Sequence, residues 1–136
     1  MMKENELVRY SIDFSVEVVS FYKWLVDTKK EFVMSKQLLR SGTSIGANIH
    51  EAQYASSRAD FINKMQIALK ETSETEYWFI ILEKTGFFDE KFNLMKEKCF
   101  SIKRMLIATI NTSKNQFKID CAATQCSLIK LKSVTK

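Results

Sequence analysis

Four long segments of this chain place apolar side chains three and four residues apart, the spacing of one face of an α-helix. These segments cover roughly residues 6–27, 33–55, 58–85 and 89–111, and short stretches connect them. The chain contains no proline and only three glycines, so few residues interrupt a helix. Four long helices with short connections are typical of a bundle. We therefore predict an all-α fold, an antiparallel up-down-up-down four-helix bundle.

The first segment carries a second apolar row beside its main one. Ile12, Val16, Val19 and Val26 make up this row. The combined apolar stripe is wider than one packed face requires. We expect this helix to contact more than one neighbour or another subunit.

Two residues mark expected helix ends. Gly86 follows the third segment, where a glycine with positive φ commonly ends a helix. Asp89 precedes the fourth segment and is a suitable N-cap.

Charge is distributed unevenly along the 136 residues, which carry a formal net charge of +5. Residues 1–113 hold 16 Lys and Arg against 15 Asp and Glu, whereas residues 114–136 hold five Lys against Asp120 alone. The net charge is therefore +1 in the first part and +4 in the second. We divide the chain into a bundle, residues 1–113, and a basic C-terminal tail, residues 114–136.

Cysteines and apolar runs indicate the compartment. Cys99, Cys121 and Cys126 are an odd number without metal-type spacing, so they indicate neither a disulfide framework nor a zinc site. The N-terminus lacks the apolar run of a signal peptide, and no stretch is long and apolar enough to cross a membrane. We expect a cytoplasmic protein with no membrane partner.

Two glycines lie four residues apart inside the second predicted helix. Gly42 and Gly46 occupy one side of it. Glycine within a helix costs about 1 kcal/mol relative to alanine, so a compensating contact is expected. We predict close packing against a neighbouring helix at both positions, in preference to a ligand site.

Polar residues border the packed faces of the second and third helices. A buried charge needs a partner, so we expect Arg40 to pair with Glu74 or Glu76 and to set the register of the two helices. The alternative is that Glu51, Glu74 and Glu76 act as acid, base or metal ligands. Di-metal bundles use a Glu-x-x-His motif, but the single histidine, His50, directly precedes Glu51. We therefore predict no catalytic site, no metal and no cofactor.

The stretches "QLLRSGTSIGANIHEA" and "FINKMQIALKETSETEYWFIILEKTGFF" resemble a bacterial family of four-helix bundles. These are the proteins named after reading frames in 23S ribosomal RNA intervening sequences, and the resemblance covers roughly residues 7–112. The matching motif residues include Arg40, Ser44, Asn48, Glu51, Glu74 and Glu76. His50 and Ala52 depart from the residues common in the family.

The resemblance implies homo-oligomers, with a homopentamer as the expected assembly, and no enzymatic activity. The family's biological role is largely unknown. It is similar in fold to the accessory variability protein of diversity-generating retroelements, which binds a reverse transcriptase and nucleic acid through a basic surface. The bundle of this chain is nearly neutral, so that comparison applies poorly here.

The tail interleaves lysines with apolar residues. Lys114, Lys118, Lys130 and Lys132 are the expected contacts if the tail binds RNA or DNA. A flexible extension and an arm that contacts a protein partner or another subunit are the other interpretations.

Three functions are therefore compared. The first is a non-enzymatic oligomeric scaffold or interaction module that binds a protein partner, the second is an RNA- or DNA-binding accessory protein, and the third is an enzyme using Glu51, Glu74 and Glu76. We favour the first, with nucleic-acid binding through the tail as its alternative.

Overall fold

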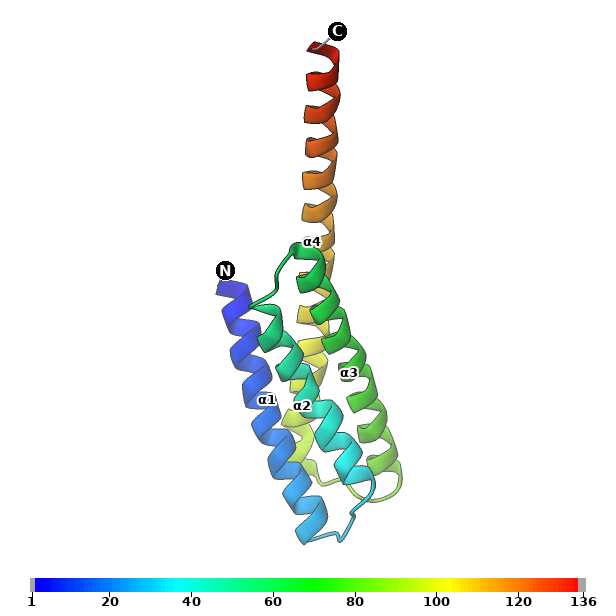
Figure 1. Ribbon diagram of the computed structural model, residues 1–136. Helices are drawn as coiled ribbons and strands as arrows, with labels where there is room; N and C mark the ends of the chain where they lie inside the picture. The colour runs from blue at the N-terminus through cyan, green and yellow to red at the C-terminus, as the bar shows by residue number, and fades with distance from the viewer. Residues whose placement is uncertain (1, 135–136) are drawn as a thin grey trace.

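The computed structural model describes the backbone of residues 2–134 and the side chains of residues 6–129. Every regular element in this part of the chain is helical, which confirms the predicted all-α class (Figure 1). The elements are α1 (Met2–Asp27), α2 (Met34–Ala52), α3 (Arg58–Lys84), the short 3-10 helix η1 (Glu90–Phe92) and α4 (Asn93–Val134).

Successive helices run in opposite directions along the long axis of the molecule (Figure 1). Each long helix packs against the next one in the chain, and α4 also contacts α1, although more sparsely. The first 20 or so residues of α4 lie within this arrangement, whereas its C-terminal part projects beyond the other helices as a single rod (Figure 1).

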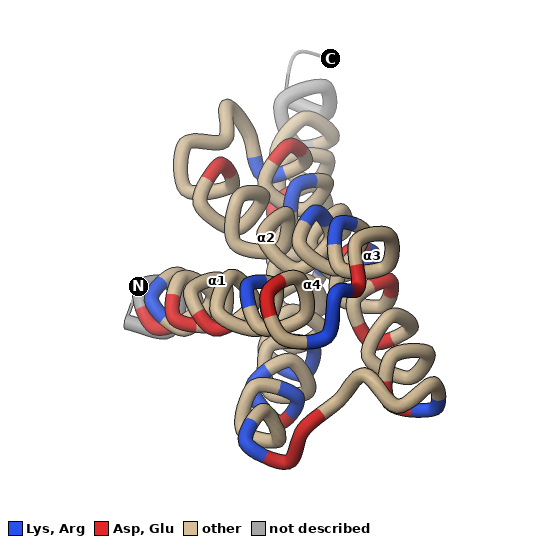
Figure 2. The backbone as a smooth tube through the Cα atoms, turned by 90° about the horizontal axis from the view of Figure 1, so that it is seen from below, with Lys and Arg blue, Asp and Glu red and all other residues tan. Residues whose placement is uncertain are grey.

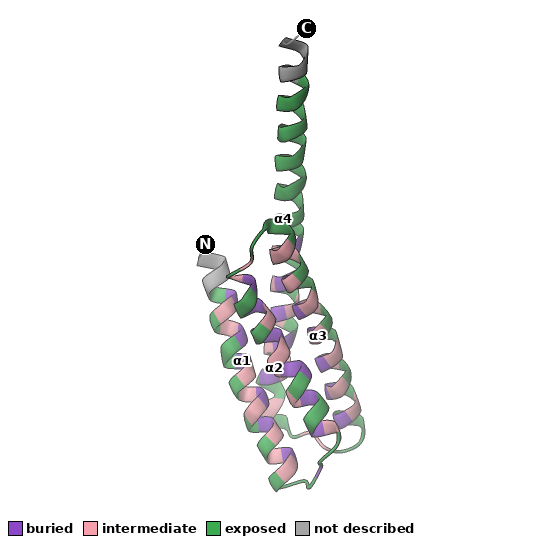
Figure 3. Cartoon of the chain, viewed as in Figure 1, coloured by how far each residue is buried: buried purple, intermediate pink, exposed green. Residues whose placement is uncertain are grey.

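Buried apolar side chains from all four helices form one core. Figure 3 colours each helix by how far its residues are buried. In α1 the main apolar row is buried, including Phe14, Val18 and Phe21. Aromatic rings gather where α1 meets the start of α4: the ring centroids of Phe21 and Phe92 are 4.6 Å apart. The 3–4 spacing read along the sequence is therefore the spacing of the core.

Gly86 ends α3, as predicted. Its φ is +85°, a left-handed conformation that glycine adopts without a Cβ clash. Phe87 N–H donates to the carbonyl of Leu82 at 2.8 Å, and Gly86 N–H donates to that of Glu83 at 3.3 Å. These two bonds make a Schellman motif, which satisfies carbonyls that a helix end leaves without partners.

Asp89 caps a different element from the one predicted. Its carboxylate accepts a hydrogen bond at 3.0 Å from the backbone N–H of Lys91 in η1, and α4 begins only at Asn93. The N-cap chemistry was correctly recognised, but a 3-10 turn separates it from α4.

The start of α2 uses an acidic cap that the sequence analysis did not predict. The carboxylate of Glu31 accepts hydrogen bonds from the backbone N–H groups of Val33, Met34 and Ser35 at 3.1, 3.0 and 2.6 Å. Burial raises the pKa of Glu31, but these backbone hydrogen bonds outweigh it and hold that pKa below its ordinary value. Glu31 thus satisfies N–H groups that the first turn of a helix leaves free.

The expected end of the fourth helix near Asn111 was wrong. Helix α4 continues without a break to Val134. Ser113 is the last buried residue in the described part of α4, and all side chains from 114 to 129 are exposed (Figure 3). No glycine or proline follows Gly86, so no strong helix-breaking residue interrupts α4.

Within residues 2–134, no helix is both long enough and apolar enough to cross a membrane.

Candidate functional site

The two glycines of α2 lie against α1. A Cβ atom built on Gly42 would lie 2.8 Å from Val18 Cγ1, closer than side-chain carbons approach one another. A Cβ on Gly46 would lie 3.0 Å from Ser15 Oγ and 3.3 Å from the carbonyl oxygen of Ser11. Both positions therefore let α1 and α2 approach closely.

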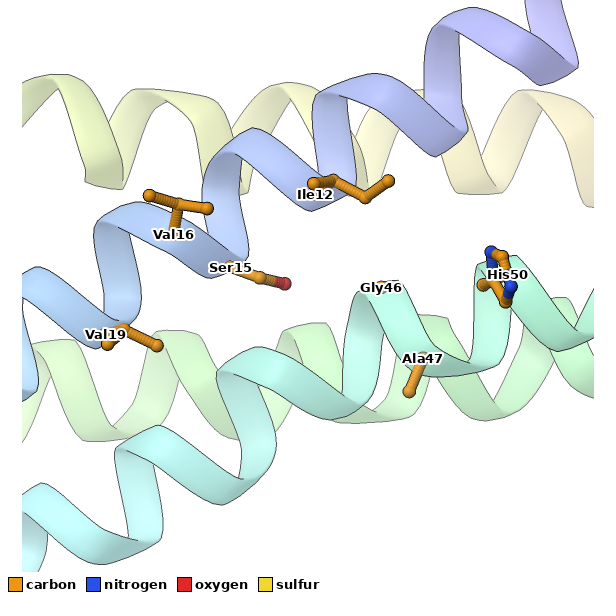
Figure 4. A pocket seen from close by; sticks show the side chains of 7 residues that line it. All are labelled: Ile12, Ser15, Val16, Val19, Gly46, Ala47 and His50. Atoms are coloured by element: carbon orange, nitrogen blue, oxygen red, sulfur yellow. The ribbon is translucent and has the colours of Figure 1, made fainter.

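An apolar groove of about 350 Å³ opens beside this crossing (Figure 4). Gly46 contributes no side chain to the groove, and neighbouring residues of α1 and α2 form its walls. The side chains of Ile12 and Val16 are 50% and 64% exposed. The lining residues are Ile12, Ser15, Val16, Val19, Gly46, Ala47 and His50.

The polar groups on the α1 side of the groove are occupied within their own helix. The Ser15 hydroxyl donates to the carbonyl of Ser11 at 2.9 Å, and the Ser11 hydroxyl donates to that of Val8 at 2.7 Å. His50 is exposed, and its ring lies 5.7 Å from that of Tyr54. The groove therefore presents apolar surface with no free hydroxyl donor from α1. Its α1 residues belong to the second apolar row noted in the sequence.

Arg40 bridges α2 to two carboxylates of α3. Its guanidinium donates hydrogen bonds to Glu74 and, at 3.4 Å, to Glu71. The hydrogen bond from Arg40 holds the pKa of Glu74 below its ordinary value. The expected pairing of Arg40 with Glu74 is confirmed, but the Arg40 side chain is 50% exposed, so the pair is not buried. Arg40 sits at the edge of the α2–α3 contact, where water reaches the charges.

Ser44 and Asn48 use their side chains within α2. The Ser44 hydroxyl donates to the carbonyl of Arg40 at 2.6 Å, and the Asn48 amide donates to that of Ser44 at 2.8 Å. These three motif residues follow one another at intervals of four, so they share one face of the helix. The side chains of Ser44 and Asn48 bond to the α2 backbone, whereas that of Arg40 reaches the glutamates of α3.

The three glutamates considered as a catalytic or metal set do not share a site. Glu51 pairs with Lys64 at 3.0 Å, and Glu76 pairs with Lys103 at 3.0 Å. Glu76 is therefore not the partner of Arg40. Among the side chains that the structure describes, no group of three His, Cys, Asp or Glu residues is placed to hold a metal ion. Each of the three carboxylates pairs with a different cation, so they do not form one site.

A buried hydroxyl contact between α2 and α3 was missed from the sequence. Thr75 Oγ1 donates to Ser41 Oγ at 3.0 Å, and both residues are buried. The available signal was that Thr75 falls within the apolar row of its segment, a position where a hydroxyl needs a partner. This contact, rather than Arg40, is the buried polar link between the two helices.

The predicted nucleic-acid contacts are only partly described. Lys114 and Lys118 are exposed on the projecting part of α4, whereas the side chains of Lys130 and Lys132 lie outside the described residues. In the bundle, Lys and Arg are interspersed with Asp and Glu (Figure 2). The last ion pair between the projecting part and the bundle joins Arg58 and Asp120 at 3.9 Å.

Comparison with known proteins identifies a matching family and a similar solved structure. A sequence model of the 23S rRNA-intervening sequence proteins matches residues 3–108. The chain belongs to this family. The match covers α1 to α3 and the bundled part of α4, and ends before the projecting part.

A solved structure supports the membership in the 23S rRNA-intervening sequence family. It is a protein of unknown function from the S23 ribosomal protein family of Bacteroides thetaiotaomicron, with 51% sequence identity and a TM-score of 0.78. The match covers 98% of that chain but 80% of this one, so part of this chain has no counterpart there. A search among curated proteins gave no match. Neither the family description nor that structure's description names an enzymatic activity.

Proposed function

We propose that this chain is a cytoplasmic, non-enzymatic interaction module that self-associates through the groove between α1 and α2. The observation that carries the proposal is the half-exposed pair Ile12 and Val16 beside a groove with apolar walls. The sequence by itself also indicated α1, because its apolar stripe is wider than packing within a single bundle requires.

Burial of this surface is energetically favourable. Removing apolar surface from water contributes about 25 cal/mol per Å². The Ser11 and Ser15 hydroxyls already donate within α1, so covering them strands no donor. The bundle carries a net charge of only +1, so two copies repel each other weakly.

A second copy of the chain is the partner that we propose for the groove. One face carries both the exposed Ile12 and Val16 side chains and the recess beside Gly46 and Ala47. A contact in which the side chains of one copy enter the recess of the next, without the reverse insertion, is heterologous, and such contacts form a ring when the rotation between copies closes. Five copies is the number that the family resemblance implies.

The test measures mass in solution. In Val16→Asp, a charge replaces a side chain that is 64% exposed, so the core stays intact while the interface acquires a buried carboxylate. Val33→Asp makes the same chemical change at a 73% exposed valine outside the groove and serves as the control. Light scattering after gel filtration should show an oligomer for wild type and Val33→Asp, and a smaller species for Val16→Asp. A monomeric wild type, or a Val16→Asp variant with the mass of the wild type, would contradict the proposal.

Nucleic-acid binding through the tail is the second candidate. Lys114 and Lys118 are exposed and form no ion pair among the described side chains. Bound phosphates release counterions, so affinity for duplex DNA should fall with salt, with a slope of about 0.9 per phosphate contact.

The matched variants are Lys114→Gln with Lys118→Gln, and Lys36→Gln with Lys70→Gln at two exposed lysines of the bundle. Only the first pair should lower the salt slope, by about 1.8 units. Equal effects of both pairs, or no binding at low salt, would reject this candidate.

A further inference from the structure

We propose that the projecting part of α4 forms a parallel coiled coil with the same segment of neighbouring copies of this chain. We call this segment, residues 114–134, the tail helix. It is a second self-association element, distinct from the groove on α1 and α2, and lies outside the part of the chain that the family match covers.

The tail helix has little to stabilise it within one copy. All its described side chains, residues 114–129, are exposed. Its contacts include the hydrogen bond between Gln116 and Asp120 at 2.9 Å and the ion pair between Asp120 and Arg58 at 3.9 Å. Helices in water gain most of their stability from packing of an apolar face, and the exposed tail helix has no such packing within one copy. A packing partner therefore accounts for its helical state.

An apolar stripe runs along the tail helix as a continuation of the buried row of α4. Ile110 and Ser113 are buried in the bundle, and the steps of three and four then lead to Phe117, Cys121 and onward. At 3.6 residues per turn, these tail residues lie within about 60° of one another around the helix axis. The described apolar residues of the stripe are Phe117, Cys121 and Leu128, and Thr124, whose hydroxyl donates to the carbonyl of Asp120, lies between the last two.

The spacing favours another helix as the occupant of the stripe. From Phe117 the steps are four, three and four, and Leu131 continues them by three in the sequence. Apolar residues alternating at three and four are the signature of a coiled-coil seam. A second copy of the chain carries the same stripe, at the same distance from its own bundle, so two tail helices can pair in register.

Charges beside the seam favour the parallel orientation. Lys118 and Gln125 flank the seam on one side, and Asp120 and Ser127 flank it on the other. In a parallel pair, the lysine side of one helix faces the aspartate side of its partner, whereas an antiparallel pair sets lysine sides against each other. A ring of copies related by one rotation axis also points all tail helices the same way.

Two native cysteines allow a direct test with the full chain. Cys121 lies on the stripe, and Cys126, five residues later, lies about 140° away from it around the helix. Cys126→Ser leaves Cys121 as the accessible thiol, and Cys121→Ser leaves Cys126. Cys99 takes no part in either variant, because it is buried and burial raises its pKa to about 12.

Dilute protein is oxidised briefly with copper phenanthroline and separated on a non-reducing gel. Two thiols from two copies lose two protons and pass two electrons to the copper, and one S–S bond forms between the copies. Cys126→Ser should give a covalent dimer, and Cys121→Ser should remain a monomer on the gel. Equal cross-linking of both variants, or of neither, would overturn the proposal.

A second pair of variants tests the seam itself. In the Cys126→Ser background, Leu128→Lys puts a charge on the stripe, whereas Ile129→Lys puts the same charge beside it on a side chain that is 68% exposed. The cross-linking rate should fall roughly tenfold or more in Leu128→Lys, as for loss of an apolar seam residue, and stay near its starting value in Ile129→Lys. Equal rates in the two variants would contradict a coiled coil.

Two further outcomes separate this proposal from the functions above. Cross-linking that requires added duplex DNA would overturn it in favour of a tail that binds nucleic acid. A Val16→Asp variant that keeps the mass of the wild-type oligomer, with Cys121-selective cross-linking retained, would reject the groove and support the tail helix.

Discussion

Gly42 of α2 lies directly against Val18 of α1. A Cβ at position 42 would be 2.8 Å from Val18 Cγ1 and 3.0 Å from Cγ2. The absence of a side chain brings the two helices together, and the contact offsets the cost of about 1 kcal/mol that a glycine imposes on a helix. The same close approach sets the floor of the groove beside Gly46.

Gly42→Ala should destabilise the protein by about 1–3 kcal/mol, because the added methyl overfills a packed contact. This is the reverse of the effect expected from helix propensity. Urea unfolding measures the change. In a Val18→Ala background the same substitution should cost less, since the clashing methyl groups are gone. Unchanged or higher stability of Gly42→Ala would disprove the close contact.

Arg40→Ala should cost only about 0.2–1 kcal/mol, because Arg40 is half exposed and water screens its pairs with Glu71 and Glu74. The cost should shrink further in 1 M salt, which shortens the screening length to about 3 Å. Thermal unfolding of wild type and variant at low and high salt provides the comparison. A loss of several kcal/mol that salt leaves unchanged would mean that the pair is desolvated.

Glu31 should make the free energy of unfolding depend on pH in the acid range. Its pKa in the folded protein lies below its ordinary value of 4.5, so its contribution to stability is present above that value and is lost as the pH falls through the folded pKa. Glu31→Gln should therefore be less stable than wild type near neutral pH, by about 0.5–2 kcal/mol for a weakened cap. The difference should narrow as the pH drops below 4.5.

Unfolding by urea at several pH values measures this dependence. Glu97→Gln is the control, because Glu97 is exposed and forms no ion pair among the described side chains. A constant difference between wild type and Glu31→Gln across the pH range would show that the charge of Glu31 contributes nothing.

Gly86→Ala should lower stability by about 1–2 kcal/mol, the cost of placing an L-residue in the left-handed region. The strain comes from the backbone alone, since a Cβ at position 86 would meet no atom within 4 Å. Gly86→Asn should cost less, because asparagine tolerates this conformation better. Equal melting temperatures for glycine and alanine would place Gly86 outside the left-handed region.

Local features were readable along the chain. The four apolar repeats predict the helices and their core faces, because a helix returns to the same side every three or four residues. The role of Gly86 as the end of α3 was also predictable, because a left-handed backbone conformation depends on a single residue. The second apolar row of α1 was also readable, because helical periodicity places its residues on one face. In the structure Ile12, Val16 and Val19 of this row line the groove.

Pairings between helices were only partly readable in this way. Arg40 was expected to meet Glu74 or Glu76, and the structure confirms Glu74, adds Glu71 and assigns Glu76 to Lys103. Which cation reaches which carboxylate depends on the rotation and register of whole helices, and these follow from the sum of many core contacts.

The cap made by Glu31 and the exposure of the tail helix also depend on the tertiary structure and not on local sequence. Glu31 caps α2 because the loop after α1 folds its carboxylate onto three N–H groups, a geometry that no short sequence motif here announces. In the tail helix the 3–4 spacing continues past residue 113, but its side chains are exposed because the other helices end there. Periodicity along the chain specifies a helix and its faces, whereas the lengths and packing of the neighbouring helices decide which faces are covered.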